Sequence, residues 1–234
     1  MAPWYRILPN ILQRGIWVPT RLTLRFFVHF RITGWQQVAS LPRGVIFALN
    51  HSSELDAVIL PASFPFLSIL FPMFYLSRPR DFYKRSGWRQ YFYGGTLFLM
   101  WGAYPAPVNQ HNYEASLKHH VTILQRGNSL CVFPEGGVSP DGTLRKGRGG
   151  VSYLSWRSGK PVVPVAIKGS WGMSIGDFLL RRKSISINFG DPIFPRELFL
   201  HCQGEPVVNA TQNDFNTATV FIMSKISELK ERYP

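Results

Sequence analysis

The stretch Leu49-Asn50-His51-Ser52-Ser53-Glu54-Leu55-Asp56 joins two apolar runs of the chain. The run before it, residues 44–49, predicts a short buried strand. The run after it, residues 57–60, predicts the start of a buried helix. A turn from a strand to a helix is the repeating unit of an α/β sheet, so this stretch indicates that fold class and places His51 at the mouth of a helix.

His51 and Asp56 are five positions apart in this turn. Ser52 and Ser53 are good N-cap residues, so we expect the helix to begin directly after His51. Asp56 then lies about one turn along the helix, within reach of the imidazole ring. A histidine that is held by a carboxylate is a candidate general base, whereas a histidine taken alone is more often a core residue bonded to a backbone carbonyl.

The rest of the chain continues the alternation of strands and helices. The expected fold is therefore α/β, a single domain whose central mixed sheet is flanked by helices. We assign residues 34–234 to this domain, and find no internal repeat or linker within it. Further strands are expected at residues 72–77, 130–133, 161–167 and 185–189, and further helices at residues 109–126, 151–157 and 215–229.

Residues 1–33 mix aromatic and aliphatic side chains with several arginines. This composition is typical of an amphipathic segment that lies on a membrane surface, and Pro19 is expected to split it into two helical pieces. A helix packed on the domain with a solvated basic face would explain the pattern equally well. We predict an N-terminal amphipathic membrane-associating segment over residues 1–33.

The overall composition is apolar and basic. Hydrophobic residues make up 45% of the chain and charged residues only 17%, while the net charge is +13. Such a charge favours anionic partners, and no nucleic-acid-binding motif accompanies it, so phospholipid headgroups are preferred to nucleic acid. The longest apolar stretch, residues 57–76, contains three prolines, which argues against one spanning helix without excluding a shallow insertion.

The two cysteines, Cys131 and Cys202, form neither a disulfide framework nor a zinc-site spacing. A reducing compartment is expected. The first residues lack the order of a secretory signal peptide. No metal site is predicted.

Five short motifs follow one another along the chain, and together they resemble the glycerolipid acyltransferase superfamily. Its best-known members acylate glycerol phosphate and lysophosphatidic acid. The resemblance covers roughly residues 30–195. The motifs are the His51 turn, Gly102-Ala103-Tyr104-Pro105, Phe133-Pro134-Glu135-Gly136, Lys146-Gly147 and Val163-Pro164-Val165-Ala166.

This resemblance implies an O-acyltransferase of phospholipid biosynthesis at the cytoplasmic face of a membrane. The fatty acyl group would come from acyl-CoA or acyl-carrier protein as co-substrate, without a bound cofactor, and would pass to a hydroxyl of a lysophospholipid such as lysophosphatidic acid. His51 would take the proton of that hydroxyl, and Asp56 would orient the ring.

The resemblance also implies an acceptor site around the turn that contains Phe133-Pro134-Glu135-Gly136. Glycine allows close approach of the backbone, so the turn could bind the acceptor or stabilise the thioester oxyanion. Glu135 could alternatively be a turn carboxylate that accepts hydrogen bonds from neighbouring amides. The candidate acceptor-binding residues are Glu135, Gly136, Gly137, Arg145, Lys146 and Arg148.

Two family arginines are absent from this chain. Members that bind a phosphate acceptor usually carry Thr-Arg-Ser where this chain has Gly137-Val138-Ser139, and an arginine near the position of Val108. An apolar residue cannot replace the fork of an arginine on a phosphate. Either the cations of residues 145–148 bind the phosphate, or the acceptor is a different lipid. A catalytically silent relative that binds lipid or acyl-CoA is the remaining alternative.

Overall fold

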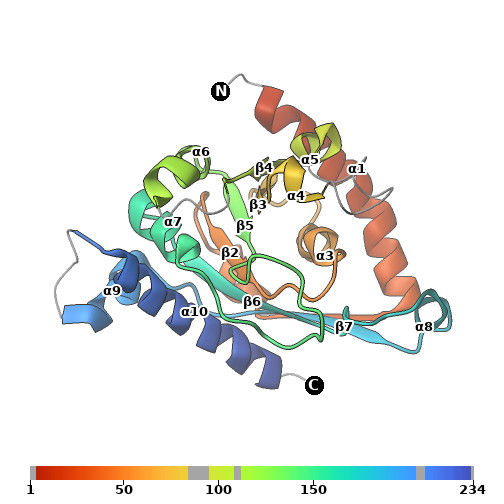
Figure 1. Ribbon diagram of the computed structural model, residues 1–234. Coiled ribbons are helices and arrows are strands. Elements are labelled where there is room, and N and C mark those ends of the chain that lie inside the picture. Colours follow the sequence, from red (N-terminus) through yellow and green to blue (C-terminus); the bar gives the residue numbers. More distant parts are fainter. Residues whose placement is uncertain (1–3, 84–94, 108–111, 204–208, 233–234) are drawn as a thin grey trace.

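The structure, a computed structural model, describes residues 4–83, 95–107, 112–203 and 209–232 (Figure 1). Its centre is a seven-stranded sheet in the order β1-β7-β6-β2-β5-β3-β4. Neighbouring strands are parallel except β6 and β7, which are antiparallel, so the predicted α/β fold with a mixed central sheet is confirmed. The strands are β1 (His29–Thr33), β2 (Ile46–Leu49), β3 (Met73–Ser77), β4 (Ala103–Pro105), β5 (Ser129–Val132), β6 (Val162–Lys168) and β7 (Ser184–Phe189).

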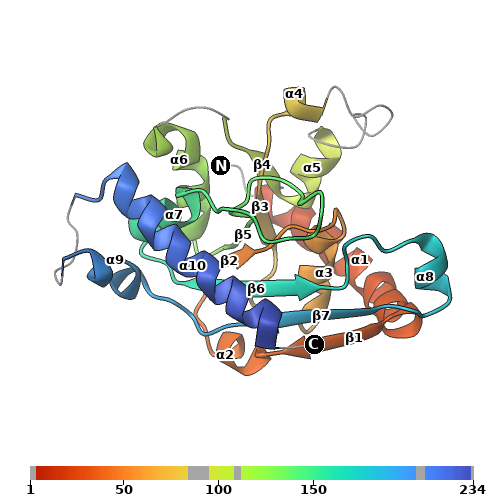
Figure 2. The ribbon, with the colours of Figure 1, turned by 60° about the horizontal axis from the view of Figure 1, so that its bottom comes forward.

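Helices cover both faces of the sheet, as Figures 1 and 2 show. One face packs against α1 (Trp4–Phe27), α2 (Trp35–Ala39) and α3 (Asp56–Ser63). The other face packs against α6 (Tyr113–Gln125), α7 (Gly150–Ser158), α9 (Pro195–Gln203) and α10 (Gln212–Arg232). Three short helices lie in the connections: α4 (Arg80–Tyr83), α5 (Thr96–Trp101) and α8 (Ile175–Leu179).

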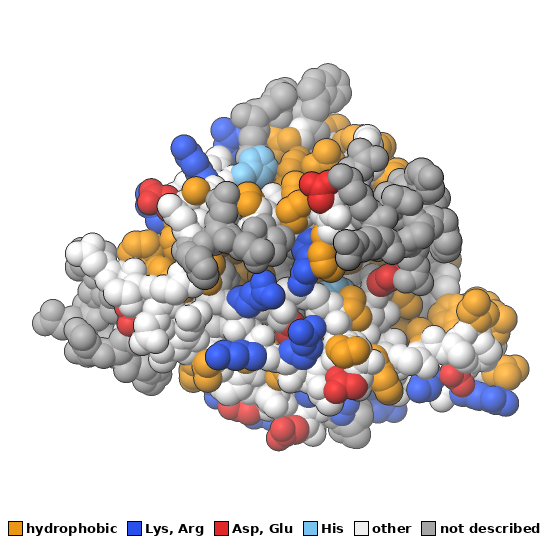
Figure 3. Space-filling model, in the orientation of Figure 1, with side chains coloured by type: hydrophobic (Ala, Val, Ile, Leu, Met, Phe, Trp, Pro, Cys, Tyr) orange, Lys and Arg blue, Asp and Glu red, His pale blue; other side chains and the backbone are white. Residues whose placement is uncertain are grey.

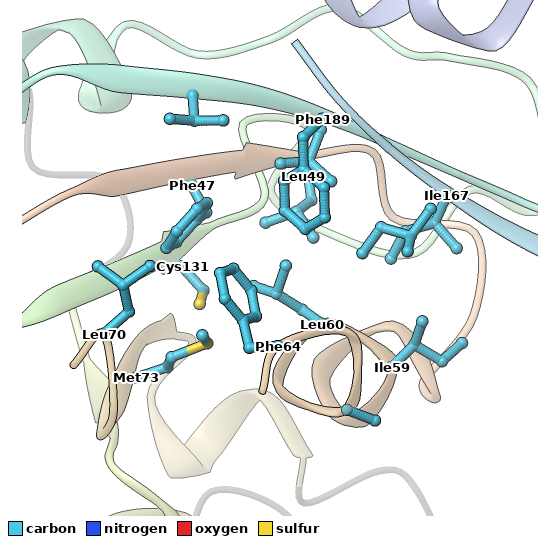
Figure 4. Close-up of a cluster of buried hydrophobic side chains, with 14 of the residues drawn as sticks. Phe47, Leu49, Ile59, Leu60, Phe64, Leu70, Met73, Cys131, Ile167 and Phe189 are labelled. Atoms are coloured by element: carbon cyan, nitrogen blue, oxygen red, sulfur yellow. The ribbon is translucent and has the colours of Figure 1, made fainter. Parts of the chain in front are cut away.

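The core on the α3 face fixes the strand that leads to the His51 turn. Figure 4 shows Phe47 and Leu49 of β2 close to Phe64, which directly follows α3. The ring centroids of Phe47 and Phe64 are 5.3 Å apart, and those of Phe64 and Phe189 are 5.4 Å apart. Burial of each such side chain contributes about 1.5–3 kcal/mol, so both ends of the turn are firmly anchored.

Helix α1 runs without interruption from Trp4 to Phe27, and the expected split at Pro19 is therefore wrong. A proline inside a helix removes one backbone hydrogen bond, but side chains on both sides of it hold this helix to the domain. Before Pro19, Trp17 Nε1 donates to Phe64 O at 2.8 Å, and after it Arg21 Nη1 donates to Ala62 O at 2.5 Å. These bonds keep the two halves of α1 in line.

The last five residues of the N-terminal segment, His29–Thr33, form the edge strand β1 and pair with β7. The apolar stretch 57–76 is divided between α3, a connection and β3. Of the helices in the described ranges, none combines the length and the hydropathy that crossing a membrane requires.

Candidate active site

The two turns singled out by the sequence lie at one edge of the sheet. Strands β2 and β5 are parallel neighbours, with Ala48 opposite Val132. The carboxyl ends of parallel neighbours meet at the same edge, where open α/β sheets bind their ligands. The His51 turn follows β2 and the Glu135 turn follows β5, so the sheet brings them together.

The predicted pairing of His51 with Asp56 is present. His51 Nδ1 lies 3.2 Å from Asp56 Oδ2, and the Asp56 side chain is fully buried. The same oxygen accepts hydrogen bonds from the amides of Ser52 and Ser53, each at 2.8 Å. The carboxylate therefore has a fixed position and faces the ring.

The local geometry of this pair differs from the expectation. Helix α3 begins at Asp56, and its N-cap is Leu55, which makes no side-chain cap bond. The expected caps at Ser52 and Ser53 are wrong, because these residues contribute backbone amides that bind the Asp56 carboxylate. Asp56 is thus the first residue of the helix, and a carboxylate is stabilised at that end of the helix dipole.

Ser170 completes the environment of Asp56. Its hydroxyl donates to Asp56 Oδ1 at 2.9 Å and lies 3.1 Å from Ser52 Oγ. Ser170 follows β6, the other neighbour of β2, and its side chain is buried. Both oxygens of Asp56 consequently accept hydrogen bonds.

The imidazole of His51 is also held from its backbone and from one ring face. The backbone amide of His51 donates to Glu135 Oε1 at 2.8 Å. The imidazole ring of His51 stacks on the ring of Phe133, with centroids 3.9 Å apart and planes 19° apart. Ring, backbone and carboxylate contacts together restrict His51 to one orientation.

Glu135 connects two loops of the site. Oε1 accepts from the His51 amide, and Oε2 accepts from the Arg145 amide at 3.0 Å. Burial raises the pKa of this carboxyl, and its side chain is 3% exposed. The geometry is that of a carboxylate bonded to neighbouring amides, and direct contact between Glu135 and an acceptor stays a prediction.

Two guanidinium groups pack against the glycines that follow Glu135. Arg78 Nε donates to Gly136 O at 2.7 Å. A Cβ atom at Gly137 would lie 3.2 Å from Arg78 Nη2, and one at Gly136 would lie 3.2 Å from Arg148 Nε. A larger residue would require these guanidinium groups to shift by a few tenths of an ångström, and Gly136 also has a φ of +73°, a conformation that favours glycine.

A cavity of about 1350 Å³ opens beside these turns. His51 and the predicted residues Gly136, Gly137, Arg145, Lys146 and Arg148 line it together, while Asp56 and Glu135 lie behind its wall. Figure 3 shows several Lys and Arg side chains in the middle of the molecular face that it draws.

The walls of the cavity differ in character. Arg78 and the cations of residues 145–148 form its basic wall, and side chains from α1, α3 and α5 form an apolar wall. Val138, at the position of an absent family arginine, lines the cavity, whereas Val108 lies outside the described residues. Residues of the apolar wall include Ile16, Ala57, Val58, Phe98 and Trp101.

Three residues of the site were not predicted. Ser170 is 114 positions from Asp56, and no local pattern marks such a contact. Phe133 lies in a recognised motif, but the motif carries no sign of a contact with the His51 ring. Arg78 belongs to a basic stretch, which by itself indicates a solvated surface. In the part of the chain that the structure describes, no group of three His, Cys, Asp or Glu residues could hold a metal ion.

Comparison with known proteins adds independent information. A family model described as Acyltransferase matches residues 29–168. A probable 1-acyl-sn-glycerol-3-phosphate acyltransferase of Mycoplasma pneumoniae is 26% identical over 134 residues, which are 56% of this chain and 46% of that protein. The chloroplastic 1-acyl-sn-glycerol-3-phosphate acyltransferase BAT2 of Brassica napus is 24% identical over 174 residues, which are 73% of this chain and 47% of that protein. The chain thus spans about half the length of these relatives.

The fold has a counterpart among solved structures. The crystal structure of the 1-acyl-sn-glycerophosphate (LPA) acyltransferase PlsC from Thermotoga maritima matches with a TM-score of 0.63 at 16% identity. The match covers 96% of this chain and 81% of that one. At this identity the likeness concerns the fold. The family model, however, spans more than half of the chain and includes both turns of the site, so this protein belongs to the acyltransferase family.

Proposed function

We propose that this protein transfers a fatty acyl group from a thioester donor, acyl-CoA or acyl-carrier protein, to a hydroxyl of a lysophospholipid at a membrane surface. Lysophosphatidic acid is the first candidate acceptor. The observation that carries this proposal is the 3.2 Å contact between His51 and a fully buried Asp56, at the wall of a cavity that both basic and apolar residues line.

His51 has the geometry of a general base. A carboxylate only accepts hydrogen bonds, so the proton of the ring lies on Nδ1, facing Asp56, and Nε2 is left to accept a proton. Nε2 takes the proton of the acceptor hydroxyl while the hydroxyl oxygen attacks the thioester carbonyl carbon. The carbon–sulfur bond then breaks, and the leaving thiolate takes up the proton. A base positioned in this way contributes about 10²–10⁴-fold to the rate.

Asp56 stabilises the imidazolium that forms during the reaction. Its carboxylate is fixed by the amides of Ser52 and Ser53 and by the hydroxyl of Ser170. Because these donors are already in place, little reorganisation is needed when the ring becomes charged.

The basic wall supports a phosphate-bearing acceptor. Arg78 lies against Gly136 and Gly137, next to the position where Val138 replaces the family arginine. We infer that Arg78, with Arg145, Lys146 and Arg148, binds the phosphate in place of the absent arginine. Guanidinium groups suit this task, since they bind phosphate oxygens through two parallel hydrogen bonds.

The apolar wall supports a long acyl chain. Pockets for small ligands usually measure about 300–1,000 Å³. The cavity of about 1350 Å³ is larger, which fits two substrates that meet at His51.

The direct test is an acceptor screen with radiolabelled acyl-CoA and acyl-carrier protein. The acceptors are lysophosphatidic acid, glycerol 3-phosphate, lysophosphatidylcholine and a monoacylated glycolipid. We expect product with lysophosphatidic acid. Product only with an acceptor that lacks a phosphate monoester would overturn the acceptor assignment, and no product with any pair would favour the silent relative.

The same screen tests the role of Arg78. Arg78→Gln is expected to raise the KM for lysophosphatidic acid about 10-fold or more, because a charged hydrogen bond contributes about 1.5–3 kcal/mol. The KM for the acyl donor should change little. Arg196→Gln, an exposed arginine of α9, is the matched control.

A further inference from the structure

A second apolar surface lies where the short helix α8 meets the C-terminal end of α1. Ile175 is 80% exposed, and Leu179 and Leu180 are 56% and 61% exposed. On α1, Leu22 and Phe26 are 61% and 63% exposed. We call this surface the α1–α8 patch, formed by Val18, Leu22, Phe26, Ile175, Leu179 and Leu180.

The two halves of the α1–α8 patch are joined by ring contacts. Phe27 stacks on Phe178 with centroids 5.0 Å apart, and the Arg181 guanidinium lies 5.8 Å from the centre of the Phe26 ring. Figures 1 and 2 both show α8 beside this end of α1. Val18, Leu22 and Phe26 are spaced by four residues and so share one face of α1, which makes the patch continuous.

Helix α8 is held in place by its own capping box. Ser174 Oγ accepts from the Asp177 amide at 3.0 Å, and the Asp177 carboxylate accepts from the Ser174 amide at 3.2 Å. Such reciprocal bonds fix the start of a helix. The apolar side chains of α8 are thus displayed by an ordered turn and are not exposed through fraying.

Basic side chains flank the α1–α8 patch. Arg181, Arg182 and Lys183 follow α8, and Arg25 lies in the last turn of α1. Helix α1 contains no acidic residue, and Asp177, which is engaged in the capping box, is the only one between residues 171 and 183. Figure 3 shows hydrophobic side chains over α8 with Lys and Arg at their lower edge.

This combination selects one kind of partner. Apolar side chains that project from a short helix and have Lys and Arg along one edge match the interface of an anionic bilayer, where the apolar side chains enter the acyl boundary and the cations meet the headgroups.

We propose that residues 171–183 are a second membrane contact, which enters an anionic bilayer together with α1. A single helix on the bilayer would leave the domain free to rotate about the axis of that helix. Contact through two separate elements fixes the orientation of the domain relative to the membrane. The inference rests on the proposed action at a membrane surface, but it is tested by vesicle binding without acyl transfer, so either proposal can fail alone.

The first test replaces Ile175, Leu179 and Leu180 by serine in the full chain. Flotation with vesicles of phosphatidylcholine and phosphatidylglycerol (3:1) measures binding. We expect an affinity at least about 10-fold lower than that of the wild type, because three apolar side chains no longer enter the lipid. Val220→Ser is the control, since Val220 is 58% exposed on α10, on the other side of the sheet.

The second test reverses two charges with Arg182→Glu and Lys183→Glu. Binding should fall on the anionic vesicles and stay unchanged on vesicles of phosphatidylcholine alone, and the loss should shrink at high salt. An equal loss on both vesicle types would contradict the role given to the cations.

A third test reports whether residue 175 enters the lipid, and it applies even if the triple variant folds poorly. Ile175→Cys in a Cys202→Ser background carries an environment-sensitive fluorophore, while the other cysteine, Cys131, is buried. We expect a blue shift of its emission on vesicle binding. A water-like emission from the bound protein would overturn the proposal, as would a triple variant that binds vesicles normally or loses only self-association.

Discussion

The turns after β2 and β5 place similar carboxylates in different surroundings. Asp56 and Glu135 are both buried at the same edge of the sheet, and both accept two backbone amides. Asp56 additionally faces an imidazole nitrogen, whereas the partners of Glu135 are the amides of His51 and Arg145.

We propose that the hydrogen-bond partner of each buried carboxylate determines its role. Asp56 acts on a ring that lines the cavity, so we assign it to the chemistry. Glu135 joins the His51 turn to the loop of residues 145–148, so we assign it to the architecture. The following predictions run from the largest expected effect on kcat to the smallest.

Loss of the imidazole is expected to have the largest effect. His51→Ala should lower kcat by about 10³-fold or more, toward the upper end of the contribution of a general base. Thermal unfolding and vesicle binding should stay near the wild type. His119→Ala, an exposed histidine on α6, is the control, and substantial activity of His51→Ala would refute the proposed base.

Asp56→Asn tests the role of the carboxylate in the His51 turn. An amide keeps the volume but no longer stabilises an imidazolium, so kcat should fall by about 10²-fold with little change in KM. Both kcat and KM are measured from initial rates of radiolabelled product formation in quenched time points. A variant with normal kcat would show that Asp56 only supports the fold of the turn, and the contrast with Glu135 would disappear.

Glu135→Ala tests the second turn. It leaves the amides of His51 and Arg145 without their acceptor. Both are only part-buried, so each costs about 1–2 kcal/mol, and the free energy of unfolding should fall by about 2–4 kcal/mol. The kcat should fall by only about 10-fold. Urea denaturation measures the stability, with Glu228→Ala on the exposed face of α10 as the control. A kcat loss as large as that of Asp56→Asn would place Glu135 in the chemistry.

Ser170→Ala is expected to have the smallest effect. It removes one of the hydrogen bonds to Asp56, which contributes about 1 kcal/mol, or roughly fivefold in kcat. Ser152→Ala removes a buried hydroxyl of α7 that is bonded to Thr219 of α10. The two variants should lose similar stability, and only Ser170→Ala should lose activity. Equal activity in both would mean that Ser170 does not position Asp56.

The central sheet could be predicted because buried parallel strands are short apolar runs, as in β2, β5 and β6. The edge strand β1 was missed, although Phe30 and Ile32 alternate with polar residues, because its arginine and histidine matched a membrane-surface segment. Pro19 was misread for a different reason. Side-chain bonds from α1 to distant backbone outweigh the local cost of a proline, and such bonds leave no pattern in the sequence.

The site was predictable where its parts are close in sequence. His51 and Asp56 share one turn, and Glu135 lies in a recognisable motif. The contacts of Ser170 and Arg78 depend on which strands become neighbours, since β6 and β3 flank β2 and β5 in the sheet. That arrangement emerges from packing of the whole domain, and local patterns do not encode it.

The pairing of β1 with β7 has a consequence for the order of folding. Thr33 Oγ1 donates to Asn188 Oδ1 at 2.6 Å across 155 residues of chain. Closing so long a loop is entropically costly, so we expect β1 to join the sheet late. Until then α1, which ends just before β1, lacks part of its packing on the domain. A lipid surface can then compete with the domain for the apolar side chains of α1. Pulsed hydrogen exchange during refolding, with and without vesicles, would show whether the amides of β1 become protected last.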